Sequence, residues 1–99
     1  MRPIFRGFPK AARSELGKAI LKLQKGSILT LPLSRPMRQV GPGVEELRVR
    51  DASGIYRAFY LARIEDQVLV FHAFQKRTPK TPQREIDTGK RRLRELLNA

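Results

Sequence analysis

Three β-type runs separated by very short connections constrain the fold of this 99-residue chain more than any other feature. In VEELRVRD (44–51), apolar and charged residues alternate with the period of a half-buried strand. IYRAFYLARI (55–64) is rich in β-forming residues, and QVLVFHAF (67–74) is apolar on both faces, which favours a central strand. Because such short turns join antiparallel neighbours, the sequence predicts a β-meander.

Helices are expected on either side of this meander. In FPKAARSELGKAILKLQKG (8–26), Pro9 suits a helix start and Gly26 suits the C-terminal cap. Apolar residues at helical spacing predict the buried face, which consists of Ala12, Leu16, Ala19, Ile20 and Leu23. Residues 27–43 are rich in Pro and Gly and predict a turn-rich connection with room for one short helical turn.

The sequence QREIDTGKRRLRELLN (83–98) predicts a C-terminal helix. Thr81 is expected as its N-cap and Pro82 as its first helical residue. Its apolar face is expected to consist of Ile86, Leu93 and Leu97. The basic run KRRLR is most simply the solvated face of this helix.

These elements together predict the α+β class. An N-terminal helix, or a helical hairpin, precedes an antiparallel meander of three to four strands, and a C-terminal helix follows. A chain of 99 residues is too short for two hydrophobic cores, so residues 1–99 are expected to form a single domain.

The charge balance narrows the classes of function. Twenty-one Lys and Arg against nine Asp and Glu give a net charge of +12 and a pI near 11.3. Such a surface attracts polyanions, of which nucleic acid and the ribosome are the first candidates. No apolar run reaches the roughly 18 residues that span a bilayer, and none resembles a signal peptide. We therefore expect a cytoplasmic protein that binds no membrane.

Metal and redox chemistry are disfavoured by composition. The chain has no cysteine, which excludes disulfides and thiolate metal sites, and it has one histidine. We expect neither a metal nor another cofactor.

Arginines interrupt the predicted strands at Arg48, Arg50, Arg57 and Arg63. An exposed sheet face does not need arginine, and its planar fork suits phosphate oxygens better than lysine does. Several arginines on one face would form an electropositive floor. The alternative is a solvated face on which Arg50 and Arg63 pair with Asp51, Glu65 or Asp66. Composition leaves the two interpretations balanced.

The adjacent carboxylates Glu45 and Glu46 should point to opposite faces of their strand. We interpret them as solvated charge at a strand end, because acidic side chains are rarely buried.

Lys76 and Arg77 directly follow the last strand, at the start of QKRTPKTP (75–82). The two Thr-Pro steps stiffen this loop, since each proline fixes its own φ and restricts the preceding residue. A stiff loop would hold its cations in place, whereas the alternative is an ordinary flexible basic loop. His72 is expected on the strand face opposite Phe71, most simply as a hydrogen-bonded structural residue.

Four aromatic residues of the strands are mainly expected in the core, although any of them at a sheet edge could stack on a base. They are Tyr56, Phe59, Tyr60 and Phe74.

Several motifs follow one another in an order that is specific in combination. They are GPGVEELRVRD, IYRAFY and VLVFHAFQKRTPKTP, followed by a basic C-terminal helix. This succession resembles the phage-derived HigB-like branch of the RelE/ParE toxin superfamily. The resemblance covers residues 7–98, and FPKAARSELG is similar to the first helix of that family.

The resemblance implies the toxin of a type II toxin-antitoxin system, which enters the ribosomal A site and cuts mRNA. In such enzymes the 2′-OH of the RNA attacks the adjacent phosphate without a metal. By position, Arg57 is expected to hold the phosphate, and Lys76, with a pKa depressed by nearby arginines, to act as a base or proton relay. The candidate catalytic residues are Arg48, Arg57, His72, Lys76 and Arg77. The candidate RNA-binding residues are Arg50, Tyr60, Phe74, Lys80 and Arg84.

The chain departs from the family pattern at both ends. The family opens with a short strand before the first helix, for which MRPIFRGF (1–8) leaves little room. Some relatives carry a catalytic Tyr on the final segment, which has none here, so proton transfer would pass to His72 or to a lysine.

The expected partners are the ribosome, mRNA and a cognate helix-turn-helix antitoxin, with which the toxin could form a heterotetramer. We expect that antitoxin to place acidic residues or an apolar helix over Arg57 and Lys76. Two other functions stay open: a ParE-like poison of DNA gyrase with the same fold, and a non-catalytic module that binds RNA or the ribosome.

Overall fold

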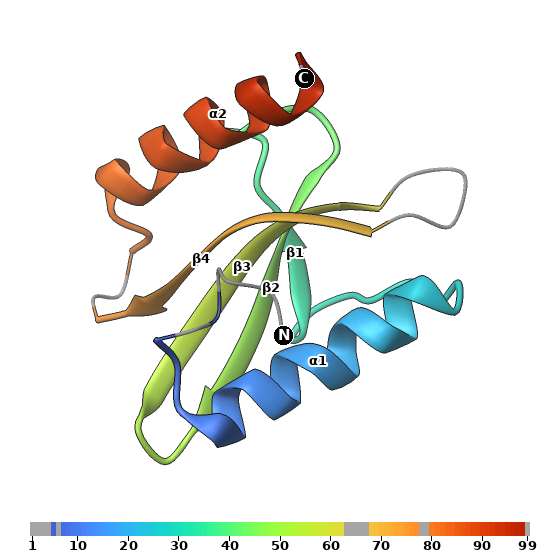
Figure 1. The fold of residues 1–99 in the computed structure, drawn as a ribbon, viewed down its shortest axis with the longest axis vertical. Coiled ribbons are helices and arrows are strands. Elements are labelled where there is room, and N and C mark those ends of the chain that lie inside the picture. The colour runs from blue at the N-terminus through green and yellow to red at the C-terminus, as the bar shows by residue number, and fades with distance from the viewer. Residues whose placement is uncertain (1–4, 6, 63–67, 78–79, 99) are drawn as a thin grey trace.

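One antiparallel sheet lies between two helices (Figure 1). The structure is a computed structural model that describes residues 5, 7–62, 68–77 and 80–98. The elements follow in the order α1 (Lys10–Gln24), β1 (Ser34–Pro36), β2 (Val44–Asp51), β3 (Gly54–Ala62), β4 (Val68–Lys76) and α2 (Gln83–Leu97). The strand order is β1-β2-β3-β4, and all neighbours are antiparallel. The α+β class predicted from the sequence is confirmed.

Helix α1 packs on one face of the sheet through the five residues that the spacing predicted. Ala12, Leu16, Ala19, Ile20 and Leu23 are all buried. They form a core with the strand residues that point to this face, which are Leu47, Val49, Tyr56, Ala58, Tyr60, Val68 and Val70. The helix is bounded by Pro9 and Lys25, and Gly26 follows with a φ of 95°, a conformation that favours glycine.

The connection between α1 and β2 contains a strand that the sequence did not predict. Residues 34–36 form β1, which pairs with β2 so that Ser34 lies opposite Leu47. Pro36 ends this edge strand, a position where proline is tolerated in a sheet. With β1, the meander reaches the upper end of the predicted three to four strands.

The prediction that the most apolar run is a central strand was wrong. It forms β4, which lies at the end of the sheet order, and the inner strands are β2 and β3. β4 is nevertheless buried on both faces, because Val68 and Val70 join the core under α1 whereas Phe71 and Phe74 join the core under α2. Burial on both faces therefore explains its composition without a central position.

A bulge in β4 corrects the predicted orientation of His72. Phe59 pairs with His72 and Tyr60 pairs with Val70, which leaves Phe71 as an extra residue in the ladder. The extra residue interrupts the alternation of faces. Phe71 and His72 consequently both contact the α2 side instead of pointing to opposite faces.

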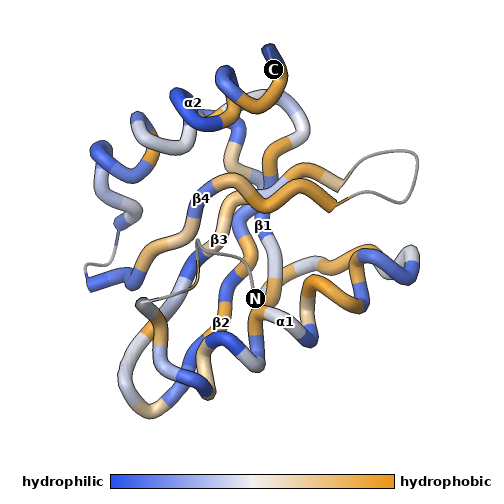
Figure 2. Tube along the Cα trace, viewed as in Figure 1, coloured by the Kyte–Doolittle hydropathy of each residue, from blue (hydrophilic) through white to orange (hydrophobic). Residues whose placement is uncertain are grey.

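Helix α2 touches the sheet through a few small and apolar residues. Ile86, Gly89 and Leu93 are buried, whereas Leu97, predicted on the same face, is 50% exposed. A Cβ at Gly89 would lie 2.7 Å from Cδ2 of Phe59, so glycine allows the helix to approach the sheet closely. Figure 2 shows hydrophilic residues along most of α2, with hydrophobic residues only at intervals.

The start of α2 also differs from the prediction. The helix begins at Gln83 with Pro82 at the N-cap position and without a side-chain cap, so Thr81 is not the N-cap. Its hydroxyl instead donates a hydrogen bond to Glu46. In the part of the chain that the structure describes, no helix is long and apolar enough to cross a bilayer.

Candidate functional site

Side chains on the α2 side of the sheet form three successive rows, because residues paired across antiparallel strands share a face. The first row consists of Arg35, Glu46, Phe59 and His72. The second row consists of Arg48, Arg57 and Phe74. The third row, next to the β2–β3 turn, consists of Arg50, Ile55 and Lys76. We refer to Arg48, Arg50, Arg57 and Lys76 as the cation cluster.

Four predicted site residues from three strands are thus brought together in the cation cluster. Arg48 lies directly opposite Arg57, an arrangement of like charges that is unfavourable in a sheet. Arg57 is only 5% exposed, Arg48 and Lys76 are half-buried, and Arg50 is exposed. Arg48, Arg50 and Arg57 border a surface hollow of about 320 Å³ whose wall includes Pro32 and Leu33. An anion in this hollow would relieve the repulsion between the guanidiniums.

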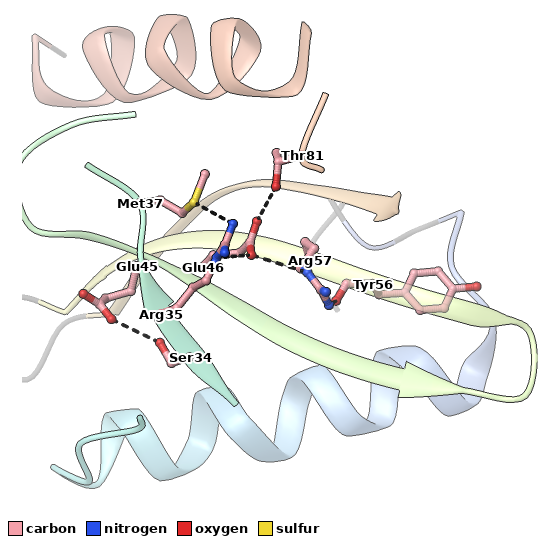
Figure 3. Close-up of polar contacts among 8 residues, drawn as sticks. All are labelled: Ser34, Arg35, Met37, Glu45, Glu46, Tyr56, Arg57 and Thr81. Carbon is pink, nitrogen blue, oxygen red and sulfur yellow. Dashed lines mark hydrogen bonds and ion pairs between the residues drawn. The ribbon is translucent and has the colours of Figure 1, made fainter. Parts of the chain in front are cut away.

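Glu46, interpreted from the sequence as a solvated charge, is fully buried beside the cation cluster. Its Oε1 lies 3.2 Å from Nε of Arg35 and 3.4 Å from Nε of Arg57. These are ion pairs without hydrogen-bond alignment. Its Oε2 accepts a hydrogen bond of 3.2 Å from the Thr81 hydroxyl. Figure 3 shows Glu46 between the two arginines, with Thr81 reaching it from the segment that leads into α2.

The two acidic neighbours in β2 do point to opposite faces, as predicted, but only one is near the arginines. Glu45 accepts a hydrogen bond of 3.3 Å from Ser34 on the α1 side. Glu46 is buried because it is the counterion of a buried guanidinium, a group that is rarely found unpaired in a protein interior.

The electrostatic environment changes the pKa of two members of the cation cluster. Burial lowers the pKa of Arg57, the carboxylate of Glu46 raises it, and Arg48 and Arg35 lower it. The pKa of Lys76 is lowered in the direction predicted from the sequence, with burial as the first cause and the charge of Arg57 as the second. Lys76 therefore releases its proton more readily than an ordinary lysine.

His72, a candidate for proton transfer, has both ring nitrogens engaged by α2. Its Nε2 lies 2.7 Å from Oε1 of Glu85, and its Nδ1 lies 2.9 Å from Nη1 of Arg92. Since a guanidinium can only donate, Nδ1 accepts and the Nε2–H donates to Glu85. Burial lowers the pKa of His72, Glu85 raises it and Arg92 lowers it. This geometry favours the structural interpretation of His72 as a link between β4 and α2.

The other basic candidates lie outside the cation cluster. Arg77 is exposed and donates to Gln75, Lys80 is exposed, and Arg84 is exposed on α2 beside Glu85. Arg63 and the first Thr-Pro step, at residues 78–79, fall outside the described residues.

Both aromatic RNA-binding candidates are buried, although Phe74 pairs with Arg57 of the cation cluster across the β3–β4 ladder. Tyr60 is 2% exposed in the core under α1, where its hydroxyl lies 2.6 Å from that of Ser34. Phe74 is buried under α2 and stacks on His72 with ring centroids 5.5 Å apart. These positions correspond to the core interpretation of both residues and not to base stacking.

Asp51, which the alternative interpretation paired with arginine, instead holds the β2–β3 turn. Its Oδ1 accepts hydrogen bonds from the backbone and hydroxyl of Ser53 and from the backbone of Gly54. These bonds, led by the Ser53 hydroxyl, lower the pKa of Asp51. It therefore neutralises none of the arginines through a contact in the described part of the chain.

Sequence reasoning missed three residues of the site: Arg35, Glu46 and Thr81. A signal was present for Glu46, since it precedes Arg48 by two residues and must share its face in a strand. Arg35 and Thr81 come from a turn-rich connection and a loop, where no helix or strand periodicity predicts which way a side chain points.

The comparison with protein families was decisive for classification. The model of the phage-derived Gp49-like protein family (DUF891) matches residues 4–94. The chain belongs to this family. Gp49-like proteins are associated with RelE-like toxins, and membership is compatible with the toxin of a toxin-antitoxin system. Searches of curated proteins and of solved structures found no significant match.

Among the residues that the structure describes, no three His, Asp or Glu side chains lie close enough together to hold a metal ion.

Proposed function

We propose that this Gp49-like protein is a toxin that cuts mRNA on the ribosome, using the cation cluster to bind the scissile phosphate. The observation that carries the proposal is the pair Arg48 and Arg57, opposed on neighbouring strands beside a surface hollow. Such a pair of like charges destabilises the sheet, but it can stabilise the negative charge that accumulates on a phosphate during cleavage. The net charge of +12 supports an RNA-rich target.

The reaction proposed is a transesterification within the RNA. The 2′-oxygen forms a bond to the adjacent phosphorus while the bond from phosphorus to the 5′-oxygen breaks. The products are a 2′,3′-cyclic phosphate and a 5′-hydroxyl, whose oxygen takes up a proton from water as its bond to phosphorus breaks. Arg57 and Arg48 would stabilise the charge on the non-bridging oxygens. Lys76, whose pKa is lowered, would accept the proton of the 2′-hydroxyl in its neutral form.

The test is cleavage of a defined mRNA on purified ribosomes, followed by primer extension. We expect Arg57→Ala to lower the single-turnover rate by about 100-fold or more, which is typical of removing a group that stabilises transition-state charge. Arg94→Ala is the matched control, because Arg94 is exposed on α2 and belongs to none of the three rows. Cleavage that is unchanged in Arg57→Ala contradicts the proposal. Inhibition of DNA supercoiling with intact translation would instead indicate a gyrase poison.

We further propose that a cognate antitoxin covers an apolar surface that adjoins the cation cluster. Ile28 is 89% exposed, and Leu31 and Leu33 are also exposed. Leu33 borders the hollow beside Arg48 and Arg57 as well as a second hollow rimmed by lysines of α1. An acidic amphipathic segment fits this combination of apolar and cationic groups.

Neutralisation of the toxin by the product of the adjacent reading frame tests this partner. Leu31→Glu should retain cleavage but escape neutralisation by the antitoxin. Leu97 is also an exposed apolar residue but lies on α2, so Leu97→Glu should remain neutralised. Equal neutralisation of both variants would contradict the proposed surface.

A further inference from the structure

Glu46 makes more contacts than the neutralisation of a single arginine requires. It is a carboxylate with 0% exposure in the middle of a sheet, where an acidic side chain is rarely found. One oxygen contacts two guanidiniums, from β1 and from β3, and the other accepts a hydrogen bond from the segment after β4. Three separate parts of the chain therefore meet at one carboxylate.

The contact with Arg57 constrains how that guanidinium is oriented. Glu46 approaches Nε, at 3.4 Å, and Nη1 donates to the backbone carbonyl of Tyr56, also at 3.4 Å. The hydrogen bond to Tyr56 limits the rotation of the planar group, and the ion pair, although it lacks hydrogen-bond alignment, holds the charge of the guanidinium next to Glu46. An arginine without these contacts would be pushed away from Arg48, which lies directly opposite.

The hydrogen bond from Thr81 joins the same carboxylate to the loop that carries basic residues. Thr81 lies between the end of β4 at Lys76 and the start of α2 at Gln83. Its bond to Glu46 spans 35 positions in sequence and ties this loop to the second strand of the sheet. Thr81 is thereby held against the sheet, while the ladder with β3 holds Lys76.

We propose that Glu46 is a positioning residue of the site: it holds the Arg57 guanidinium in place within the cation cluster and, through Thr81, holds the start of α2 against the sheet. This inference rests on the proposed function. Glu46 takes no proton and touches no RNA in this role. Its carboxylate instead keeps a buried cation charged and in one orientation before the phosphate arrives, so that no rearrangement is needed during the reaction.

The experiment compares Glu46→Gln with Glu45→Gln in single-turnover mRNA cleavage on purified ribosomes. The two substitutions are chemically identical and adjacent, but Glu45 lies on the other face of β2. We expect Glu46→Gln to lower the rate constant at saturating ribosome by about 10- to 100-fold, a loss typical of a misplaced catalytic group. Glu45→Gln should cleave at the wild-type rate.

A second pair of variants separates positioning from stability. Thr81→Val removes the hydroxyl at nearly constant shape, and Thr81→Ser restores it. We expect a slower rate in the first and recovery in the second. Ile20→Ala in α1 should lower the melting temperature without changing the rate of the folded protein, which shows that destabilisation alone does not reproduce the effect.

A third measurement needs no cleavage. The Nε–H proton of Arg57, assigned by its loss in Arg57→Lys, should exchange slowly with water in the wild type and faster in Glu46→Gln. If Glu46→Gln is folded, keeps slow exchange and cleaves like Glu45→Gln, the positioning role is overturned while the proposed function stands.

Two other outcomes are also decisive. If Glu46→Gln does not fold, equal cleavage rates in Thr81→Val and Thr81→Ser overturn the inference. If the wild type cleaves no mRNA on the ribosome, the proposed function fails and the positioning role fails with it.

Discussion

Where α2 crosses the sheet, its apolar residues close over three phenylalanines, Phe59, Phe71 and Phe74. One row further along the inner strands, the same face carries Arg48 opposite Arg57. The two regions share this face and strand β3, and they meet where Arg57 pairs with Phe74. They differ in their side chains and in what covers them. In the first region burial serves stability, and in the second the like charges oppose it. The cation cluster is therefore the part of this face whose composition stability does not explain.

The largest expected effect on stability comes from Phe59, Phe71 and Phe74, which we refer to as the aromatic region. Phe59 is fully buried, with ring centroids 5.5 Å from Phe74 and 6.3 Å from Phe71. Phe59→Ala should reduce the free energy of unfolding by about 3–5 kcal/mol, measured by urea denaturation. Arg48→Gln, in the next row, should change it far less. A greater loss of stability in Arg48→Gln than in Phe59→Ala would contradict the conclusion that the aromatic region, and not the cation cluster, stabilises the fold.

The next effect concerns the close approach of α2 to the aromatic region. A Cβ at Gly89 would meet the Phe59 ring at 2.7 Å and 2.9 Å, whereas a Cβ at Gly17 in α1 meets nothing within 4 Å. Gly89→Ala should therefore destabilise the protein by about 1–3 kcal/mol. Gly17→Ala should stabilise it by about 0.5–1 kcal/mol, the usual gain for alanine over glycine in a helix. Thermal unfolding monitored by circular dichroism measures both, and effects of equal sign would contradict the packing described.

The pH dependence of the free energy of unfolding tests the environment of His72, which stacks on Phe74 of the aromatic region. The pKa of His72 is lowered in the folded protein, mainly by burial, so the unfolded chain binds a proton more tightly. The contribution of neutral His72 to stability is complete above about pH 6.5, the ordinary pKa of histidine, and is lost as the pH falls below it. Urea denaturation across this range should show the decline, and His72→Gln should flatten it. A wild-type slope equal to that of His72→Gln would contradict the prediction.

The smallest effect should appear in the cation cluster. Arg50 is exposed, so its contact with RNA would be largely electrostatic. Arg50→Gln should reduce the slope of log K against log salt for single-stranded RNA by about 0.7, the value for one phosphate contact. Arg94→Gln, exposed on α2, serves as the comparison and should change the slope less. Fluorescence anisotropy of a labelled oligonucleotide at several salt concentrations measures both.

Much of the fold followed from periodicity. The five buried residues of α1 were identified correctly because a helix that lies on a flat sheet has one face to bury, and spacing reveals it. Strand β2 was found from its alternation, whereas β3 was found from its β-forming residues and β4 from its apolar run. The errors lie where one residue interrupts a period, as at the bulge that places Phe71 and His72 on the same side, or where a strand is as short as β1.

For the site, the sequence by itself determined the residue types and most of their strand positions. The alternation in β2 and the β-forming residues of β3 were enough to place Arg48 and Arg57 on strands, and an excess of cations over acids was visible in the composition. What those features could not provide is the pairing between strands. Register depends on side-chain packing and turn geometry across the whole sheet, not on any one segment.

It took the folded chain to reveal that Glu46 is buried, that it contacts Arg35 and Arg57, and that Thr81 reaches it across 35 positions. A solvated carboxylate and a buried one have the same sequence, and they differ in whether distant segments supply cations and a hydroxyl around them. The same holds for His72, whose two nitrogens are engaged by residues that only the docking of α2 brings near. Local sequence thus specifies which polar groups are present, whereas the free energy of burying each group depends on neighbours that only the folded chain provides.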